Sequence, residues 1–239
     1  GICSDNIEHP NMKHAEGKDL QAWLDFDVTD GQPIVMRVAT SAVDVDGAKK
    51  NLASEINDFD FDALAQKTYN QWNDELNRIN INTVVNENDM DVFYTSLYHC
   101  FIVPNLFSDV DGRYRAHDKK IYQSESPRYT VFSLWDTFRT EHPLLNLIQR
   151  ERSIDIINTF INNYETGGLL PVWELAANET FCMIGYHAIP VIADAYFAGL
   201  EGIDYEKALE AMVNSANQEH YGVGCYREYG FIPSNCEGE

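Results

Sequence analysis

Basic residues and long apolar runs are both scarce in this sequence of 239 residues. Its 17 lysines and arginines are outnumbered by 38 aspartates and glutamates, which leaves a formal charge of −21. Because such a charge repels phosphodiester backbones and anionic lipid, we expect no nucleic-acid partner. No apolar stretch approaches the roughly 20 residues that cross a bilayer, and the first residues do not have the charged and apolar parts of a signal peptide. We therefore expect no membrane insertion.

Several chemical motifs are also missing. The sequence has no C-x-x-C pair, and its five cysteines are scattered at Cys3, Cys100, Cys182, Cys225 and Cys236. This odd, widely spaced set predicts isolated thiols rather than a disulfide framework or a zinc ribbon. The sequence also contains no G-x-G-x-x-G, H-E-x-x-H or G-x-S-x-G motif, which disfavours a dinucleotide enzyme, a zinc peptidase and a serine hydrolase. Residues 109–113 resemble the start of a calcium loop, but Lys120 stands where the glutamate ligand belongs, so we expect an ordinary turn.

Hydrophobic periodicity predicts a β segment followed by stacked helical hairpins. Apolar residues alternate over 20–26 and 34–38 around the turn at 29–33, the pattern of a hairpin with one buried face. After residue 45 the period becomes helical, with apolar stripes over 61–76, 92–101, 154–164, 184–197 and 204–213. The first strands have no visible partner, and the sequence stops where its pattern predicts the start of a helix. These features predict a piece of a longer protein.

Three segments place aromatic rings beside acids and amides, which is what a sugar-binding enzyme needs. In the first segment, 133–143, Trp135 can stack on a sugar face and Asp136 can accept hydrogen bonds from neighbouring hydroxyls. Arg139, one helical turn later, can fix the Asp136 carboxylate. The alternative is structural, with Asp136 as a helix N-cap and Arg139 as its partner.

The second segment, 170–180, is the densest cluster of chemically useful side chains. Glu174 lies between Trp173 and a leucine, an apolar setting that raises the pKa of a carboxyl, as a general acid for glycosidic cleavage requires. The alternative for Glu174 is a surface glutamate beside a core tryptophan. Asn178 and Glu179 stand where we expect a helix to start, so they serve either as caps or as ligands of a metal or a sugar hydroxyl.

The third segment closes the sequence at 226–239. Aromatic residues around glycine and proline predict a rigid loop. Glu237 and Glu239 offer the hard oxygen ligands that calcium prefers. Acids that complement the dipole at the start of a helix explain the two glutamates equally well.

Taken together, these segments resemble the α-mannosidases of glycoside hydrolase family 92. The matching stretches follow in order along nearly the whole chain, at 93–99, 104–105, 111–115, 129–143, 170–175, 178–180, 183–187 and 191–196. The resemblance implies a mainly α fold, in which a partial (α/α)6 barrel of stacked helical hairpins is preceded by a short β-sandwich remnant. The implied parts are 1–45 for the last sandwich strands, 46–80 for a helical linker and 81–239 for the first part of the barrel.

The resemblance also implies an activity, which is calcium-dependent hydrolysis of terminal α-mannosyl residues of glycans, N-glycans among them, with inversion. Inversion needs an acid and a base carboxylate about 6.5–9.5 Å apart, with water between them. By motif position the general acid is Glu174, with Glu179 as the fallback. The implied sugar contacts are Trp135, Asp136, Arg139, Trp173 and Asn178. The implied Ca²⁺ ligands are Asn178, Glu179, Glu237 and Glu239.

Two departures from the family pattern bear on activity. Ala177 and Phe181 stand where the family often has glycine, and the later acidic motif that should supply the general base is absent from this sequence. Without a base the inverting reaction cannot run, so we expect this piece alone to have little or no activity. The sequence does not fix the linkage, for which α1,2 is one candidate.

Other expectations concern the surroundings of the protein. The family implies a parent protein in the periplasm, secreted or on the cell surface. Half a helical barrel exposes apolar faces, which predicts self-association. A non-catalytic carbohydrate-binding module and another (α/α)6 hydrolase, such as a trehalase-like enzyme, are the alternatives that the sequence leaves open.

Overall fold

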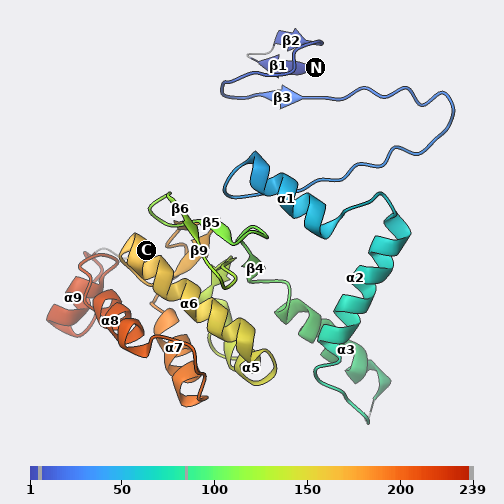
Figure 1. Ribbon diagram of the computed structural model, residues 1–239. Coiled ribbons are helices and arrows are strands. Elements are labelled where there is room, and N and C mark those ends of the chain that lie inside the picture. Colours follow the sequence, from blue (N-terminus) through green and yellow to red (C-terminus); the bar gives the residue numbers. More distant parts are fainter. Residues whose placement is uncertain (5–6, 84–85, 237–239) are drawn as a thin grey trace. The chain divides into compact units, whose positions relative to one another are not determined.

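The computed structural model describes residues 1–4, 7–83 and 86–236. The chain divides into two compact units, Gly1–Met36 and Arg37–Glu239 (Figure 1). The expected division at residues 45 and 80 stays a prediction.

The first unit holds a small antiparallel sheet with the strand order β2–β1–β3. Its strands are β1 (Ile2–Ser4), β2 (Ile7–His9) and β3 (Gln21–Ala22). The expected hairpin of 20–26 with 34–38 is wrong, because only β3 forms there and it pairs with β1. Leu24 and Met36 are exposed instead of sharing a buried face. Alternating residues favour a strand only where a second layer covers their apolar face, and these side chains have no such cover.

The second unit begins with three helices, α1 (Val45–Glu55), α2 (Phe61–Leu76) and α3 (Glu87–Cys100). Aspartates cap the first two: the Asp44 carboxylate accepts from Gly47 N at 2.7 Å, and the Asp60 carboxylate accepts from Ala63 N at 2.9 Å. These caps satisfy amide groups that have no partner inside the helix. The predicted helix over 61–76 is confirmed, and the predicted stripe over 92–101 lies mostly in α3.

The remaining helices are α4 (Leu134–Thr137), α5 (Glu141–Ile148), α6 (Arg150–Gly167), α7 (Ala188–Phe197), α8 (Tyr205–Ala216) and α9 (Val223–Tyr229). Helix α6 packs against α5, α7 and α8 (Figure 1). It contains the predicted apolar stripe over 154–164 and ends at Gly168, whose φ of 88° is left-handed. Helix α7 begins four residues later than the predicted 184, because the preceding residues form a loop.

The hydrophobic core lies among these helices. Leu134, Leu145, Phe160, Val191 and Ala211 come from α4 to α8 in turn, and all are buried. The ring of Phe160 also meets Phe132 edge to face, with ring centroids 4.8 Å apart, so the core extends to a strand. None of the described helices is both long and apolar enough to span a membrane.

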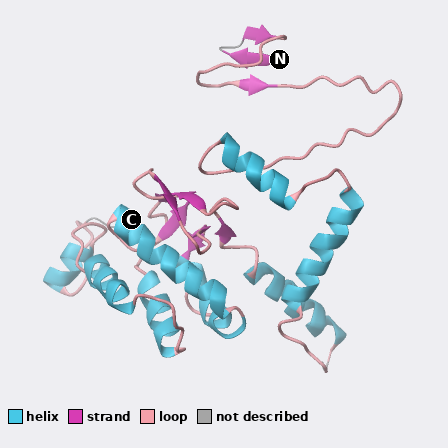
Figure 2. Cartoon of the chain, viewed as in Figure 1, coloured by secondary structure: helices cyan, strands magenta, loops and turns pink. Residues whose placement is uncertain are grey.

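Short antiparallel strands accompany the helices of the second unit (Figure 2). The strands pair as β4 (Asn105–Leu106) with β7 (Tyr129–Thr130), β5 (Arg113–Arg115) with β6 (Ile121–Gln123), and β8 (Phe132–Ser133) with β9 (Trp173–Leu175), which pairs in turn with β10 (Asn178–Glu179). A mainly α fold with small sheets is therefore confirmed. The partial (α/α)6 barrel and the sandwich remnant remain proposals.

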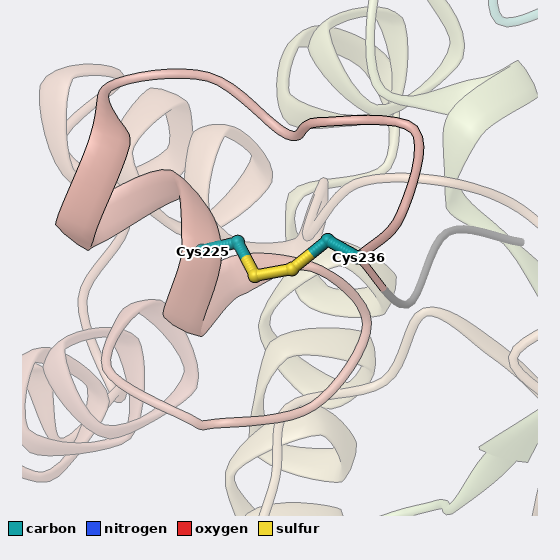
Figure 3. The surroundings of a disulfide bond; sticks show 2 residues. All are labelled: Cys225 and Cys236. Carbon is teal, nitrogen blue, oxygen red and sulfur yellow. A yellow bond between two sulfur atoms is a disulfide. The ribbon is translucent and has the colours of Figure 1, made fainter.

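A disulfide joins Cys225 of α9 to Cys236 (Figure 3). Gly230 ends α9 with a left-handed φ of 76°, and Cys236 lies in the segment that follows. The prediction of isolated thiols is wrong for this pair and holds for the other three cysteines. The spacing of 11 residues matches no local cysteine motif, so only the tertiary arrangement reveals the bond.

Candidate functional site

The sheet formed by β8, β9 and β10 presents two chemically different faces. In its register Ser133 pairs with Trp173, Phe132 pairs with Glu174, and Glu174 pairs with Glu179. Paired residues share a face, and consecutive residues point to opposite faces. Phe132, Glu174 and Glu179 therefore share one face, which we call the inner face because Phe132 and Glu174 are buried. Ser133 and Trp173 share the other, outer face.

The outer face carries Trp173, and one further predicted sugar contact, Asp136, is joined to this face through Ser133. The Ser133 hydroxyl donates a hydrogen bond to the Asp136 carboxylate, which fixes that carboxylate in the first turn of α4. Asp136 is exposed, Trp135 beside it is 40% exposed, and Trp173 is half-buried. Asp136 is not the helix N-cap of the structural alternative, because Ser133 holds that position. The outer face thus carries the half-buried Trp173 ring and, through Ser133, a fixed carboxylate acceptor.

Arg139 does not fix Asp136, because no ion pair joins the two side chains within the described residues. Its guanidinium instead lies 5.2 Å from the centre of the Phe138 ring. His187 packs against the same ring, with ring centroids 4.3 Å apart. Burial and the Arg139 charge lower the pKa of His187. The lowered pKa favours the neutral imidazole, and the Arg139 guanidinium is exposed to solvent, where it can meet a polar ligand.

Glu141 is a titratable neighbour of Asp136 that the sequence reasoning missed. Burial raises the pKa of the Glu141 carboxyl to about 7, and the nearby Asp136 charge adds to the effect. Within the described residues, the Glu141 Oε1 atom is shielded from solvent and accepts no hydrogen bond. An acid in the first turn of a helix is usually explained by the helix dipole. Its place five residues after Asp136, on an apolar helix, is the signal that could have found it.

The pKa of Glu174 is raised, as predicted. Its side chain, however, lies in an unexpected position. Burial raises the pKa of its carboxyl to about 7, against the lowering effect of its hydrogen bonds. The carboxyl accepts from Ala177 N at 2.7 Å, from the Thr130 hydroxyl at 2.9 Å and from Val131 N at 3.2 Å. At 2% exposed, Glu174 is not the surface glutamate of the alternative. It lies on the inner face, away from Trp173 and from any substrate held on the outer face.

Glu179 also binds backbone rather than reaching into solvent. Its carboxylate accepts from Val172 N at 2.8 Å, from Trp173 N at 2.9 Å and from Phe181 N at 2.8 Å. Glu179 and its neighbour Asn178 form strand β10, so the expected helix start is wrong there. The pairing with β9 determines the conformation of this segment and outweighs its local helix propensity.

The described residues do not fit a calcium site at Asn178 and Glu179. The Asn178 Oδ1 atom accepts from the Lys119 ammonium at 2.6 Å, so a cationic group already occupies that oxygen. Nowhere in 1–4, 7–83 and 86–236 do three His, Cys, Asp or Glu side chains gather closely enough to hold a metal ion. The other predicted ligands, Glu237 and Glu239, lie outside the described residues.

A cavity of about 680 Å³ lies next to this sheet. Its lining includes Val172, Phe181, Tyr186, Tyr221, Tyr226 and Ile232. Phe181 and Tyr221 stack with ring centroids 4.2 Å apart. Phe181, one of the expected departures from glycine, therefore forms part of the cavity wall. The volume and the aromatic lining are those of a small-molecule site.

Aromatic rings, a fixed carboxylate and a cavity on a helical domain are the features of a carbohydrate-active hydrolase. The comparison with known families narrows this class. The chain belongs to glycosyl hydrolase family 92, because residues 47–239 match the catalytic domain of that family. Its characterised relatives are glycoside hydrolases.

Two solved structures show the likeness in detail. The family GH92 α-mannosidase BT3965 from Bacteroides thetaiotaomicron is 41% identical, with a TM-score of 0.75 over 81% of this chain. It has also been solved in complex with mannoimidazole. The inverting mannosidase BT2199 from Bacteroides thetaiotaomicron VPI-5482 is 30% identical, with a TM-score of 0.74 over 82% of this chain. The match spans 26% and 28% of those two enzymes. No curated protein matches the chain.

Proposed function

We propose that this chain is part of an inverting exo-α-mannosidase that removes terminal α-mannosyl residues from glycans. The observation that carries the proposal is the exposed Asp136 carboxylate, fixed by Ser133, in a chain 41% identical to an α-mannosidase. The matched enzyme is known with mannoimidazole bound, which supports a mannose-like ligand. Because the match spans about a quarter of that enzyme, the proposal concerns the whole protein.

In this proposal the outer face binds the mannosyl ring. Trp135 and Trp173 offer flat apolar surfaces against which the C–H face of a sugar packs. The Asp136 carboxylate accepts hydrogen bonds from two neighbouring hydroxyls, and the exposed Arg139 guanidinium donates to a third. Asn178 has little capacity left for a sugar, because its Nδ2 atom donates to Leu175 O and Ala176 O and its Oδ1 atom is held by Lys119.

The proton donor stays a prediction. Glu174 has the raised pKa that a general acid needs. Its carboxyl reaches a glycosidic oxygen only if Thr130 and Val131 move away from it, because both donate hydrogen bonds to it in the structure. Inversion also requires a base carboxylate about 6.5–9.5 Å from the acid, and no described residue is assigned that role.

Substrate screening of the full-length protein tests the proposal. We expect hydrolysis of α-mannosides, with free mannose of inverted configuration as the first product, and no hydrolysis of α-glucosides. Asp136→Asn keeps the shape and removes the charge, so kcat/KM should fall at least 100-fold. Asp62→Asn, at an exposed position of α2, is the matched control. Cleavage of α-glucosides, or an unchanged Asp136→Asn enzyme, would contradict the assignment.

Export from the cytoplasm, to the periplasm or the cell surface, is part of the proposal. The Cys225–Cys236 disulfide supports it, because disulfides persist mainly in oxidising compartments. N-glycans and an α1,2 linkage are the substrate details we propose to screen first. Calcium dependence stays a prediction for the whole protein, since the described residues Asn178 and Glu179 do not fit the ion.

A further inference from the structure

The backbone around the β8–β9–β10 sheet is unusually strained. Four residues that are not glycine have left-handed φ angles, namely Val131 at 70°, Ala176 at 49°, Ala177 at 61° and Phe181 at 49°. Left-handed backbone is unfavourable for a residue with a side chain, most of all for a β-branched or bulky one. Such a conformation persists only where surrounding contacts hold it, and it is concentrated at functional sites.

The amide groups of these strained residues donate hydrogen bonds to two glutamates, of which Glu174 is buried and Glu179 is half-buried. Glu174 accepts from Val131 N at 3.2 Å and from Ala177 N at 2.7 Å. Glu179 accepts from Phe181 N at 2.8 Å. The remaining strained amide, that of Ala176, donates at 2.7 Å to the Thr130 hydroxyl, which itself donates to Glu174. Three of the four amides thus donate directly to one of these two carboxyl groups. The fourth, that of Ala176, is linked to Glu174 through the Thr130 hydroxyl.

A lysine binds oxygen atoms of the turn between β9 and β10. The Lys119 ammonium donates to Ala177 O and to Asn178 Oδ1. The β9–β10 turn is therefore held by the Glu174 carboxyl and the Thr130 hydroxyl on its amide groups, and by the Lys119 ammonium on its oxygens. This arrangement satisfies backbone groups that the strand ladder leaves without partners.

We propose that Glu174, Glu179 and Lys119 form a brace that positions Trp173 and Phe181 for the glycan, rather than a proton donor and metal ligands. Glu179 holds the amides of both aromatic residues, Trp173 on the outer face and Phe181 in the cavity wall. This role rests on the proposed function, since it concerns the same binding face. We call the three residues the brace.

The contacts argue against the roles that the family resemblance implies for these glutamates. A cation bound to Glu179 would compete with three amide groups whose positive ends point at its carboxylate. A proton donated by Glu174 would have to leave a carboxyl that is 2% exposed. Both residues have the contacts of side chains that fix backbone.

Substrates with different leaving groups separate the brace from an acid. In the full-length enzyme, Glu174→Gln and Glu179→Gln should lower kcat/KM about 10-fold to 100-fold on methyl and on dinitrophenyl α-mannoside alike, mainly through KM. A lost general acid behaves differently, because a dinitrophenyl group leaves without protonation. A Glu174→Gln enzyme that keeps its rate on dinitrophenyl α-mannoside alone, with a changed basic limb of the pH profile, would overturn the proposal.

Lys119 supplies a test that involves neither an acid nor a metal ligand. Lys119→Met should raise KM about 3-fold to 10-fold, and Lys119→Arg should restore part of it. Lys120→Met, at the neighbouring exposed lysine, is the matched control and should change nothing. A Lys119→Met enzyme with unchanged KM would contradict the brace. So would a calcium affinity, measured by calorimetry with the metal alone, that falls 10-fold or more in Glu179→Gln.

Amide hydrogen exchange tests the brace independently of activity. In the unaltered protein the amides of Val131, Ala177 and Phe181 should exchange at least 100-fold more slowly than exposed turn amides. The Glu179→Gln variant should speed exchange at Phe181 about 10-fold. If exchange is slow and no mannoside is cleaved, the proposed function fails and the brace stands. If the three amides exchange as fast as an exposed turn, the brace fails whatever the activity.

Discussion

At the scale of single residues, the surroundings of a carboxyl decide what it can do. Burial raises the pKa of Glu141 and of Glu174 to about 7 each. Hydrogen bonds from Arg113 and Lys50 lower the pKa values of Asp44 and Asp111 to about 2, since those bonds favour the charged form. The first pair therefore titrates near neutral pH, whereas the second pair stays charged there and forms surface ion pairs.

Glu141 makes stability depend on pH in a direction that can be worked out. Its pKa is about 7 in the folded chain, against an ordinary value of 4.5 for a solvated glutamate, so the folded state binds more protons between these values. Stability from this group is therefore complete below about pH 4.5 and is lost as pH rises through about 7. Glu141→Gln, which stays neutral, should gain roughly 1 kcal/mol over the unaltered protein between about pH 5 and about pH 8, after allowance for partial exposure.

Urea unfolding at several pH values checks this expectation. Glu206→Gln, an exposed acid in the first turn of α8, is the control and should follow the unaltered protein. Parallel stability curves for Glu141→Gln and the unaltered protein would mean that Glu141 is charged at neutral pH.

The sequence predicted the apolar surroundings of Glu174, but it did not predict that the side chain faces the core. Its apolar neighbours indicated a raised pKa, which the structure bears out. That the side chain faces the core follows from the pairing of β9 with β8 and β10, a long-range fact that no local pattern carries. Glu141 was missed for the opposite reason, because its own local pattern has an ordinary explanation in the helix dipole.

At the scale of elements, local signals predicted helices better than strands. The apolar stripe over 204–213 predicted helix α8, whose N-cap is Asp204 with a carboxylate that accepts from Lys207 N at 2.9 Å. The stretch 34–38 has equally regular alternation and forms no strand. A helix satisfies its own backbone, whereas a strand depends on a partner and a covering layer. Strand β10 illustrates the same dependence, since β9 determines its conformation.

The cap of α8 gives a test at this scale. Asp204→Ala removes the acceptor of the Lys207 amide and leaves that group without its partner. We expect a loss of about 1 kcal/mol in the free energy of unfolding. Glu206→Ala, two residues into the same helix and exposed, should cost less than half as much. Chemical denaturation measures both, and equal effects would show that the lost charge matters rather than the cap.

The disulfide also acts at the scale of an element. It ties α9 to the segment that holds Ile232, and both line the cavity. Closing a loop of this size stabilises a chain by about 2–3 kcal/mol through the lost entropy of the unfolded chain. The double variant Cys225→Ser with Cys236→Ser should lose that amount in urea unfolding. Thiol titration of the denatured protein should find 3 reactive thiols without reductant and 5 with it.

At the scale of the molecule, the described helices leave large apolar side chains uncovered. Phe197 of α7 is 84% exposed and Leu147 of α5 is 76% exposed, while Leu209 and Val213 of α8 are also exposed. The matched relatives are about four times as long as the matched region, since it covers 26% to 28% of them. Uncovered faces of this kind mark interaction surfaces, which supports the expected self-association of the 239-residue chain.

Sedimentation equilibrium of the 239-residue chain tests this last expectation. Association driven by apolar burial gains about 25 cal/mol per Å² removed from water. Replacing two of the largest exposed side chains, Phe197→Ser with Leu147→Ser, should therefore weaken the association at least 10-fold. Val45→Ser, at an exposed apolar position of α1, removes similar chemistry elsewhere and should leave it unchanged. A chain that stays monomeric at all concentrations would show that these faces do not associate, and that their exposure has another cause.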